Sequence, residues 1–223
     1  MYMIIDTETN GLPITKKYCE YPFYNDLEKY DSARIVQFTF MICDNNLEEL
    51  KLHDYIIYAE NFNIKNSEFH CITNEISKNN GYNFNTIADI FYNELQKCQY
   101  VVAHNIGFDI NVIKSELFRR KLYHIIMELD KKIEICTMKT FKYIVKAKNK
   151  YNKIKDPSLK ELYKLAFNCD MENAHNSKYD VINLHNAIKS ITNGKLENYI
   201  KNKKWYKYKE LGIINEIFST HKK

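Results

Sequence analysis

Short apolar runs dominate the first part of this 223-residue chain and predict strands. Tyr2 to Ile5, Ile35 to Cys43 and Leu50 to Tyr58 each have the length and residue types of a strand. The last two are separated by the turn-forming Asp44-Asn45-Asn46. Because strands that follow one another closely usually pair antiparallel, the three runs predict an antiparallel meander. Residues 14–34 are polar and aromatic without clear period, and we expect an insertion loop there.

From residue 72 the apolar spacing changes to that of amphipathic helices. We expect helices at 72–78, 86–97, 106–121, 137–147, 159–167 and 178–191, with two more strands at 100–103 and 134–136. Three strands followed by alternating helices and strands predict an α/β fold, in which a mixed five-stranded sheet carries helices on both faces. Five Gly and three Pro leave no flexible interdomain linker, so we expect one domain plus a tail.

Neither a membrane segment nor a secretory signal is predicted. No window approaches the roughly 18 consecutive apolar residues of a membrane span, and the amino-terminal run reaches Asp6 too early for a signal peptide. The six cysteines are scattered, with no CxxC pair and no zinc-type spacing. We therefore expect reduced thiols in a cytosol-like, cytoplasmic compartment.

The net charge of +5 is unevenly distributed. Residues 137–155 hold seven Lys and no acid, and residues 189–223 hold nine Lys against three Glu, which leaves −8 for the rest of the chain. Such separation suits a nucleic-acid enzyme, because basic strips bind phosphates and clustered carboxylates bind divalent cations. Ordinary solvated lysine faces would produce either run equally well.

The first motif pairs Asp6 with Glu8. Residues i and i+2 of a strand point to one face, so both carboxylates would meet the same cations. The alternative is a strand that runs into a polar turn, where Asp and Thr are common.

The second motif, Val101 to Asp109, places a carboxylate in the first turn of a helix that begins where a strand ends. Ligands of α/β sheets bind at that edge. Alternatively, Asn105 caps the helix and Asp109 favours its positive end.

The third motif places His175 before a helix and Asp180 inside it. A mobile histidine suits a proton acceptor, and a rigid carboxylate suits a metal ligand. The alternative is a helix cap, because Ser177 and Asp180 also match a capping box.

Together the three segments resemble the exonuclease motifs of the DEDDh, or DnaQ-like, superfamily, which includes the DNA polymerase III epsilon subunit, RNase T, oligoribonuclease and the Trex nucleases. Asp6 and Glu8 match its first motif, Asp109 the second, and His175 with Asp180 the third. The resemblance covers 2–191, so we expect an exonuclease domain there and a basic, helical C-terminal extension at 192–223. The loop at 14–34 is longer than in the epsilon subunit, and Cys71 stands where the family often has Gly.

The resemblance implies a ribonuclease H-like fold and 3′→5′ exonuclease activity. It implies two Mg²⁺ ions, with Mn²⁺ as a substitute, on Asp6, Glu8, Asp109 and Asp180, and His175 as general base. It also implies contacts between the 3′ nucleotide and Thr9, Gly11 and Leu12, for which a plain turn is the alternative. We expect His70 and Ile72 on the opposite side of the nucleotide, and a contact of Asn105 with its backbone. Expected partners are single-stranded DNA or RNA 3′ ends, and a DNA polymerase chain if the role is proofreading. We expect DNA as substrate; exoribonuclease activity or an inert end-binding module are the alternatives.

Overall fold

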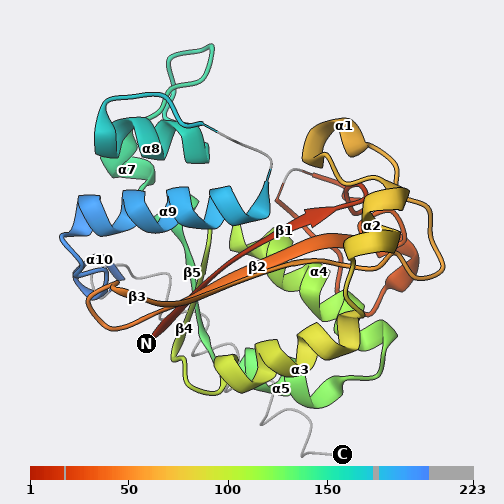
Figure 1. Ribbon diagram of the computed structural model, residues 1–223. Coiled ribbons are helices and arrows are strands. Elements are labelled where there is room, and N and C mark those ends of the chain that lie inside the picture. Colours follow the sequence, from red (N-terminus) through yellow and green to blue (C-terminus); the bar gives the residue numbers. More distant parts are fainter. Residues whose placement is uncertain (18, 173–175, 201–223) are drawn as a thin grey trace, which may run out of the picture.

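The computed structural model describes residues 1–17, 19–172 and 176–200 and contains a mixed five-stranded sheet of order β3-β2-β1-β4-β5 (Figure 1). The strands are β1 (Tyr2–Thr9), β2 (Ile35–Cys43), β3 (Glu49–Ile56), β4 (Tyr100–Ala103) and β5 (Ile133–Cys136). The first three pair antiparallel, while β4 is parallel to both β1 and β5. This arrangement confirms the predicted meander and sheet, and it places β1 at the centre.

Helices cover both faces of the sheet, as predicted (Figure 1). One face carries α3 (Phe84–Leu95), α4 (Ile106–Arg119) and α5 (Tyr123–Asp130), and the other carries α8 (Leu159–Phe167) and α9 (Ser177–Thr192). The shorter elements are η1 (Leu27–Tyr30), α1 (Ser67–His70), α2 (Asn74–Asn80), α6 (Thr137–Thr140), α7 (Lys142–Val145) and α10 (Glu197–Ile200). None of the helices in the described part of the chain is both long and apolar enough to span a membrane.

Alternate side chains of β1 enter two separate cores. Met3 and Ile5 pack with α3, α4 and α5, whereas Tyr2 and Ile4 pack with α8 and α9. All four are fully buried, as the twofold period of a strand between two helical layers requires. The same alternation decides which face each polar residue at the end of β1 occupies.

Several expected boundaries differ from the structure. β1 continues past its apolar run to Thr9, because β2 pairs with it along that length. The helix expected at 72–78 begins at Asn74, because the Thr73 hydroxyl accepts from the Ile76 N–H and caps it there.

The expected helix at 137–147 is two short helices that meet at the buried Phe141, which has non-helical dihedral angles. The sequence analysis also missed α5, which begins without a side-chain cap and buries Ile125, Ile126 and Leu129 against its neighbours. Tertiary packing, rather than a local start signal, therefore stabilises α5.

The core continues beyond residue 191, where we expected the domain to end. Leu196 and Ile200 are buried in the cluster beneath α9. The expected boundary stays a prediction, and the helix expected in the rest of the extension falls on 201–223, outside the described residues. All six cysteines are free thiols.

Candidate active site

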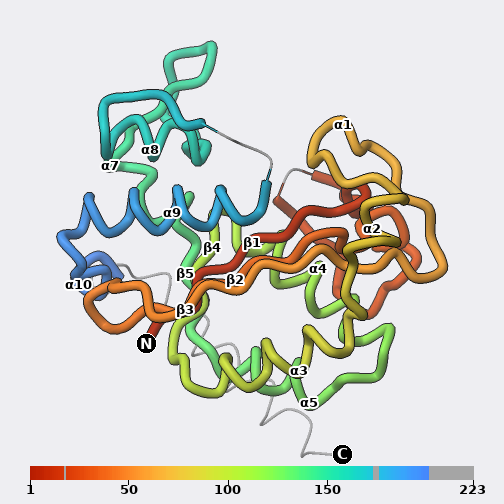
Figure 2. Tube along the Cα trace, viewed as in Figure 1, coloured from red at the N-terminus to blue at the C-terminus, as the bar shows by residue number. Residues whose placement is uncertain are grey.

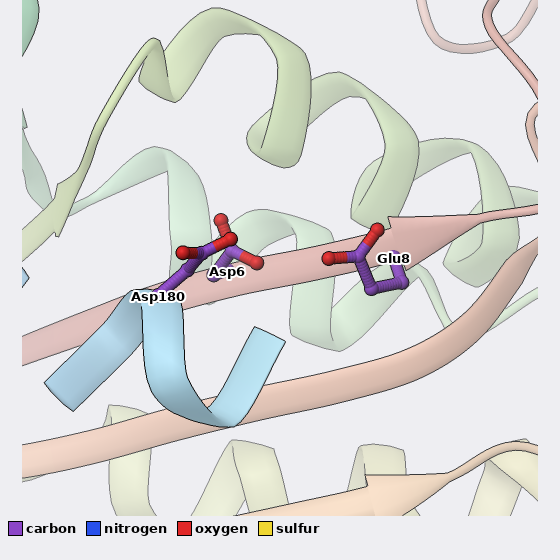
Figure 3. A group of neighbouring side chains, drawn as sticks. All are labelled: Asp6, Glu8 and Asp180. Atoms are coloured by element: carbon purple, nitrogen blue, oxygen red, sulfur yellow. The ribbon is translucent and has the colours of Figure 1, made fainter. Parts of the chain in front are cut away.

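The face of β1 that packs against α9 changes from apolar to acidic at residue 6. Asp6 and Glu8 follow Tyr2 and Ile4 in the same alternation, so their carboxylates emerge where the apolar core ends. Asp180, in the first turn of α9, approaches the same place. One oxygen from each of the three carboxylates lies within 4.8 Å of the other two. Figure 3 shows the three side chains, two from β1 and one from α9.

Helix α9 holds Asp180 against β1 by packing and by one hydrogen bond. Val181, Leu184 and Ile188 are buried on the sheet side of the helix. The Ser177 hydroxyl donates to the backbone oxygen of Asp6 at 2.7 Å. The capping-box alternative is therefore wrong, because Ser177 is already inside the helix and the side chain of the preceding cap residue makes no capping hydrogen bond.

Asp109 lies behind this group and is 2% exposed. Its Oδ1 accepts from both the N–H of Thr7, at 3.0 Å, and the Thr7 hydroxyl, at 2.9 Å. β4 pairs with β1 only as far as Ile4, so the Thr7 N–H has no strand partner on that side. Asp109 therefore satisfies a buried donor beyond the end of β4, and this fixes its side chain beside β1.

Asn105 lies at the start of α4 but does not cap it with its side chain. Its backbone is left-handed, with φ of 70°. Its amide nitrogen donates to the Tyr21 hydroxyl at 2.7 Å, and its amide oxygen accepts from the Cys19 thiol at 3.4 Å. Asn105 thus occupies the cap position of α4, as the alternative expected, but its side chain makes no capping bond and instead holds the 14–34 loop against the start of α4.

The carboxylates strongly perturb one another. Burial raises the pKa of Asp6 well above its usual value, and Asp109, Asp180 and Glu8 raise it further. Burial, followed by Asp180 and Asp109, raises the pKa of Glu8 to about 8. Burial also raises the pKa of Asp109, although the two bonds from Thr7 oppose this effect. Carboxylates that resist ionisation this strongly fit a site that binds either protons or cations.

Divalent cations fit the donor set of this group. Asp6, Glu8 and Asp180 offer only hard carboxylate oxygens, the ligands that Mg²⁺ and Mn²⁺ prefer. No thiol or imidazole belongs to the group among the described residues. The chemistry therefore favours Mg²⁺ over a metal that needs nitrogen or sulfur.

The residues predicted to contact the nucleotide differ in exposure. Thr9 donates its hydroxyl to the Gly11 oxygen at 2.7 Å, and Leu12 is 73% exposed. His70 and Ile72 are 3% and 4% exposed. The N–H of Ile72 donates to the His70 ring at 3.1 Å, so both are interior residues in this structure.

Hydrogen bonds join the two segments that carry these residues. The Asn66 amide donates to the Asn10 backbone oxygen at 2.9 Å, and the Lys65 N–H donates to the Asn10 side chain. Figure 2 shows the loop after β1 and the α1 region side by side. His175 lies outside the described residues, and its predicted role stays a prediction.

Three supporting residues were not predicted from the sequence: Thr7, Ser177 in its contact with Asp6, and His104. The His104 ring bonds the Thr137 hydroxyl at 3.0 Å and the Pro157 oxygen at 2.9 Å. Burial lowers its pKa to about 4. A polar residue beside each motif is the only signal that the sequence carries for these contacts.

The central strand of this ribonuclease H-like α/β sheet ends in clustered carboxylates, and the match to a family model identifies the class as a hydrolytic nuclease. The chain belongs to the exonuclease family named for RNase T, whose model matches residues 3–188, within the DnaQ-like superfamily. No curated protein sequence matches the chain significantly.

Solved structures share this fold. Exonuclease X in complex with 5′ overhanging duplex DNA is 19% identical, with a TM-score of 0.53, over 86% of this chain and 92% of that one. E. coli exonuclease I in complex with a dA16 oligonucleotide is 15% identical, with a TM-score of 0.67, over 90% of this chain. A zinc-bound form of the E. coli exonuclease I complex with single-stranded DNA is 14% identical, with a TM-score of 0.65 over the same share. This chain spans only 42% of the length of exonuclease I.

Proposed function

We propose that the chain is a divalent-metal-dependent 3′→5′ exonuclease of the DEDDh type, which releases nucleoside monophosphates from single-stranded or frayed 3′ ends. The observation that carries the proposal is the convergence of Asp6, Glu8 and Asp180, with Asp109 fixed behind them. The DNA bound to exonuclease X and to exonuclease I supports DNA as the substrate. The catalytic unit would lie within residues 2–191.

Asp6, Glu8 and Asp180 would hold two Mg²⁺ ions, with Mn²⁺ as a substitute, and Asp109 would complete or support their shell. When bound, such ions activate the attacking water and stabilise the leaving 3′ oxygen in an in-line displacement. The zinc-bound form of exonuclease I shows that one structural relative accepts a divalent cation.

The chain's own residues would keep this site rigid. Thr7 fixes Asp109 through two hydrogen bonds, and Ser177 fixes the start of α9 on the backbone of Asp6. A ligand held by such bonds needs no reorganisation during the reaction. His175 would act as general base, because the unperturbed pKa of a histidine side chain, about 6.5, suits proton transfer near neutral pH.

Residues at the end of β1 would contact the 3′ nucleotide. Leu12 offers an exposed apolar surface four residues after Glu8, on a loop that the bond between Thr9 and Gly11 shapes. Apolar contact with a base does not depend on base identity, so cleavage would be largely independent of sequence. Asn105, at the start of α4, would contact the nucleotide on the side opposite Leu12. His70 and Ile72 would support the wall of the binding site from beneath.

The test incubates purified protein with 5′-labelled single-stranded DNA or matched RNA, in Mg²⁺ or in EDTA. The proposal predicts a metal-dependent ladder of products shortened from the 3′ end. The strand that is shortened faster, DNA or RNA, shows the sugar preference. Asp6→Asn should abolish the ladder, whereas the matched variant Asp170→Asn, at an exposed position on the protein surface, should leave it unchanged. Binding without shortening of either strand would show an inert end-binding module and overturn the catalytic assignment.

A further inference from the structure

A basic segment projects from the domain beside α8 (Figure 1). It consists of α7 and the hairpin that follows it, and we call these residues, 142–155, the lysine arm. It contains six Lys and no acidic residue. Lys148 and Ile154 form an antiparallel bridge across it, and the Lys155 N–H donates to the Ala147 oxygen at 2.8 Å. Asn149 closes the tip by accepting from the N–H groups of Tyr151, at 2.9 Å, and Lys153, at 3.1 Å. The arm therefore has a defined backbone.

The side chains of the lysine arm are left on the surface. Tyr151 is 70% exposed and Tyr143 is 66% exposed. Four lysines are also exposed, and within the described residues no ion pair involves them: Lys146, Lys148, Lys150 and Lys153. A structured hairpin that buries neither its aromatic rings nor its charges contributes little to the core, so its composition points to a ligand.

The base of the arm is attached beside the candidate active site. Asp156 pairs with Lys139 and, at 2.9 Å, with Lys142. The oxygen of the adjacent Pro157 lies 2.9 Å from the ring of His104, which immediately precedes Asn105 and α4. Helix α8, which follows the arm, packs on α9, which carries Asp180. The arm and the carboxylates are thus held by the same helices.

We propose that the lysine arm binds the part of a single-stranded nucleic acid upstream of the 3′ end, by contacting phosphates with its lysines and stacking a base on Tyr151. This inference rests on the proposed function. The legs of the hairpin, residues 147–149 and 153–155, rise about 3.3 Å per residue, so the tip reaches roughly 10 Å beyond the paired Ala147 and Lys155. That reach would allow contact with nucleotides that are not being cleaved.

The alternation of rings and lysines favours a nucleic acid over an acidic protein surface. The Lys150 ammonium lies 5.0 Å from the centroid of the Tyr151 ring, so a charge and an aromatic face are offered together. Single strands present phosphates and bases in the same alternation. A purely acidic partner would use the lysines but would gain nothing from an exposed ring.

The test measures binding of a fluorescent 20-nucleotide single strand in EDTA, where hydrolysis is prevented, at several salt concentrations. The variant is Lys148→Ala/Lys150→Ala/Lys153→Ala. The control is Lys97→Ala/Lys121→Ala/Lys131→Ala, which removes equal charge near the ends of α3, α4 and α5. We expect only the arm variant to bind at least tenfold more weakly. The slope of log affinity against log salt concentration should become shallower by about 2, because each of three lost phosphate contacts accounts for about 0.7. Equal binding by both variants would overturn the proposal.

Substitutions of Tyr151 provide a second, independent test. Tyr151→Ala should weaken binding several-fold, and Tyr151→Phe should restore it, because stacking needs the ring and not the hydroxyl. Equal dependence of polyglutamate binding on the arm lysines, with no effect of Tyr151, would show a general anion surface and overturn the proposal. If the strand binds through the arm but Mg²⁺ produces no shortening, the proposed exonuclease function fails while the arm assignment stands.

Discussion

Asp109 accepts two hydrogen bonds from one residue, Thr7, although 102 positions separate them in the chain. The carboxylate oxygen satisfies the backbone N–H that β4 leaves unpaired and also takes the hydroxyl at 2.9 Å. Because both bonds favour the ionised form, Thr7 opposes the effect of burial on the pKa of Asp109. Thr7 is therefore a positioning residue for the candidate metal site.

Thr7→Val keeps the shape and the N–H but removes the hydroxyl. We expect the exonuclease rate to fall roughly tenfold, since a hydrogen bond to a charged group contributes about 1.5–3 kcal/mol. The rate optimum should also move to higher pH as the pKa of Asp109 rises. The control is Thr192→Val, which removes a buried hydroxyl bonded to the Ile188 oxygen at the far end of α9. It should lower thermal stability without shifting the pH optimum.

Magnesium should stabilise the protein more at high pH. Without metal, the raised pKa of Glu8, about 8, means that its contribution to stability is full below about 4.5 and is lost as pH rises through 8. Below about pH 8, Mg²⁺ must compete with the proton on Glu8. The increase in melting temperature on adding Mg²⁺ should therefore be larger at pH 8.5 than at pH 6. Differential scanning fluorimetry measures both increases, and at 100 times the Kd we expect about 5 °C or more. A pH-independent increase would contradict the assigned ligands.

His104 should make the fold sensitive to acid. Burial lowers its pKa to about 4, so the native state stays unprotonated where the unfolded chain takes up a proton. Stability is then full above about pH 6.5 and falls as pH drops toward 4, by roughly 2 kcal/mol at pH 5. Urea unfolding of His104→Gln at pH 7.5 and pH 5 should show a smaller pH dependence than the wild type. His124→Gln, on the exposed side of α5, should retain the wild-type dependence.

Leu12 should matter for substrate binding and not for stability. Because 73% of the residue is exposed, Leu12→Ala should leave the melting temperature unchanged. Loss of its contact with the terminal base should raise KM on single-stranded DNA by roughly tenfold, within the range of about 1–3 kcal/mol for contacts with bases. Leu50→Ala removes a similarly exposed leucine from β3 and should change neither quantity. Identical KM values for the two variants would remove Leu12 from the binding site.

Local patterns of apolar and polar residues predicted much of the fold. The strands expected at 35–43 and 100–103 and the helix expected at 159–167 coincide with β2, β4 and α8. The apolar period is a local property, because each element must bury one face or both faces. The pairing of Asp6 with Glu8 was predictable for the same reason, since the alternation of a strand places residues i and i+2 together. The sequence by itself thus determined the sheet, its helical layers and which side chains could carry the chemistry.

Only the tertiary structure decided how those side chains meet. The contact of Ser177 with Asp6 spans 171 positions, and no local pattern indicates it. His70 and Ile72 belong to a segment whose burial depends on packing against Val36 and Ile64. Long-range contacts form because elements distant in sequence share a core, and a buried donor such as the Thr7 N–H must then find its acceptor across the fold.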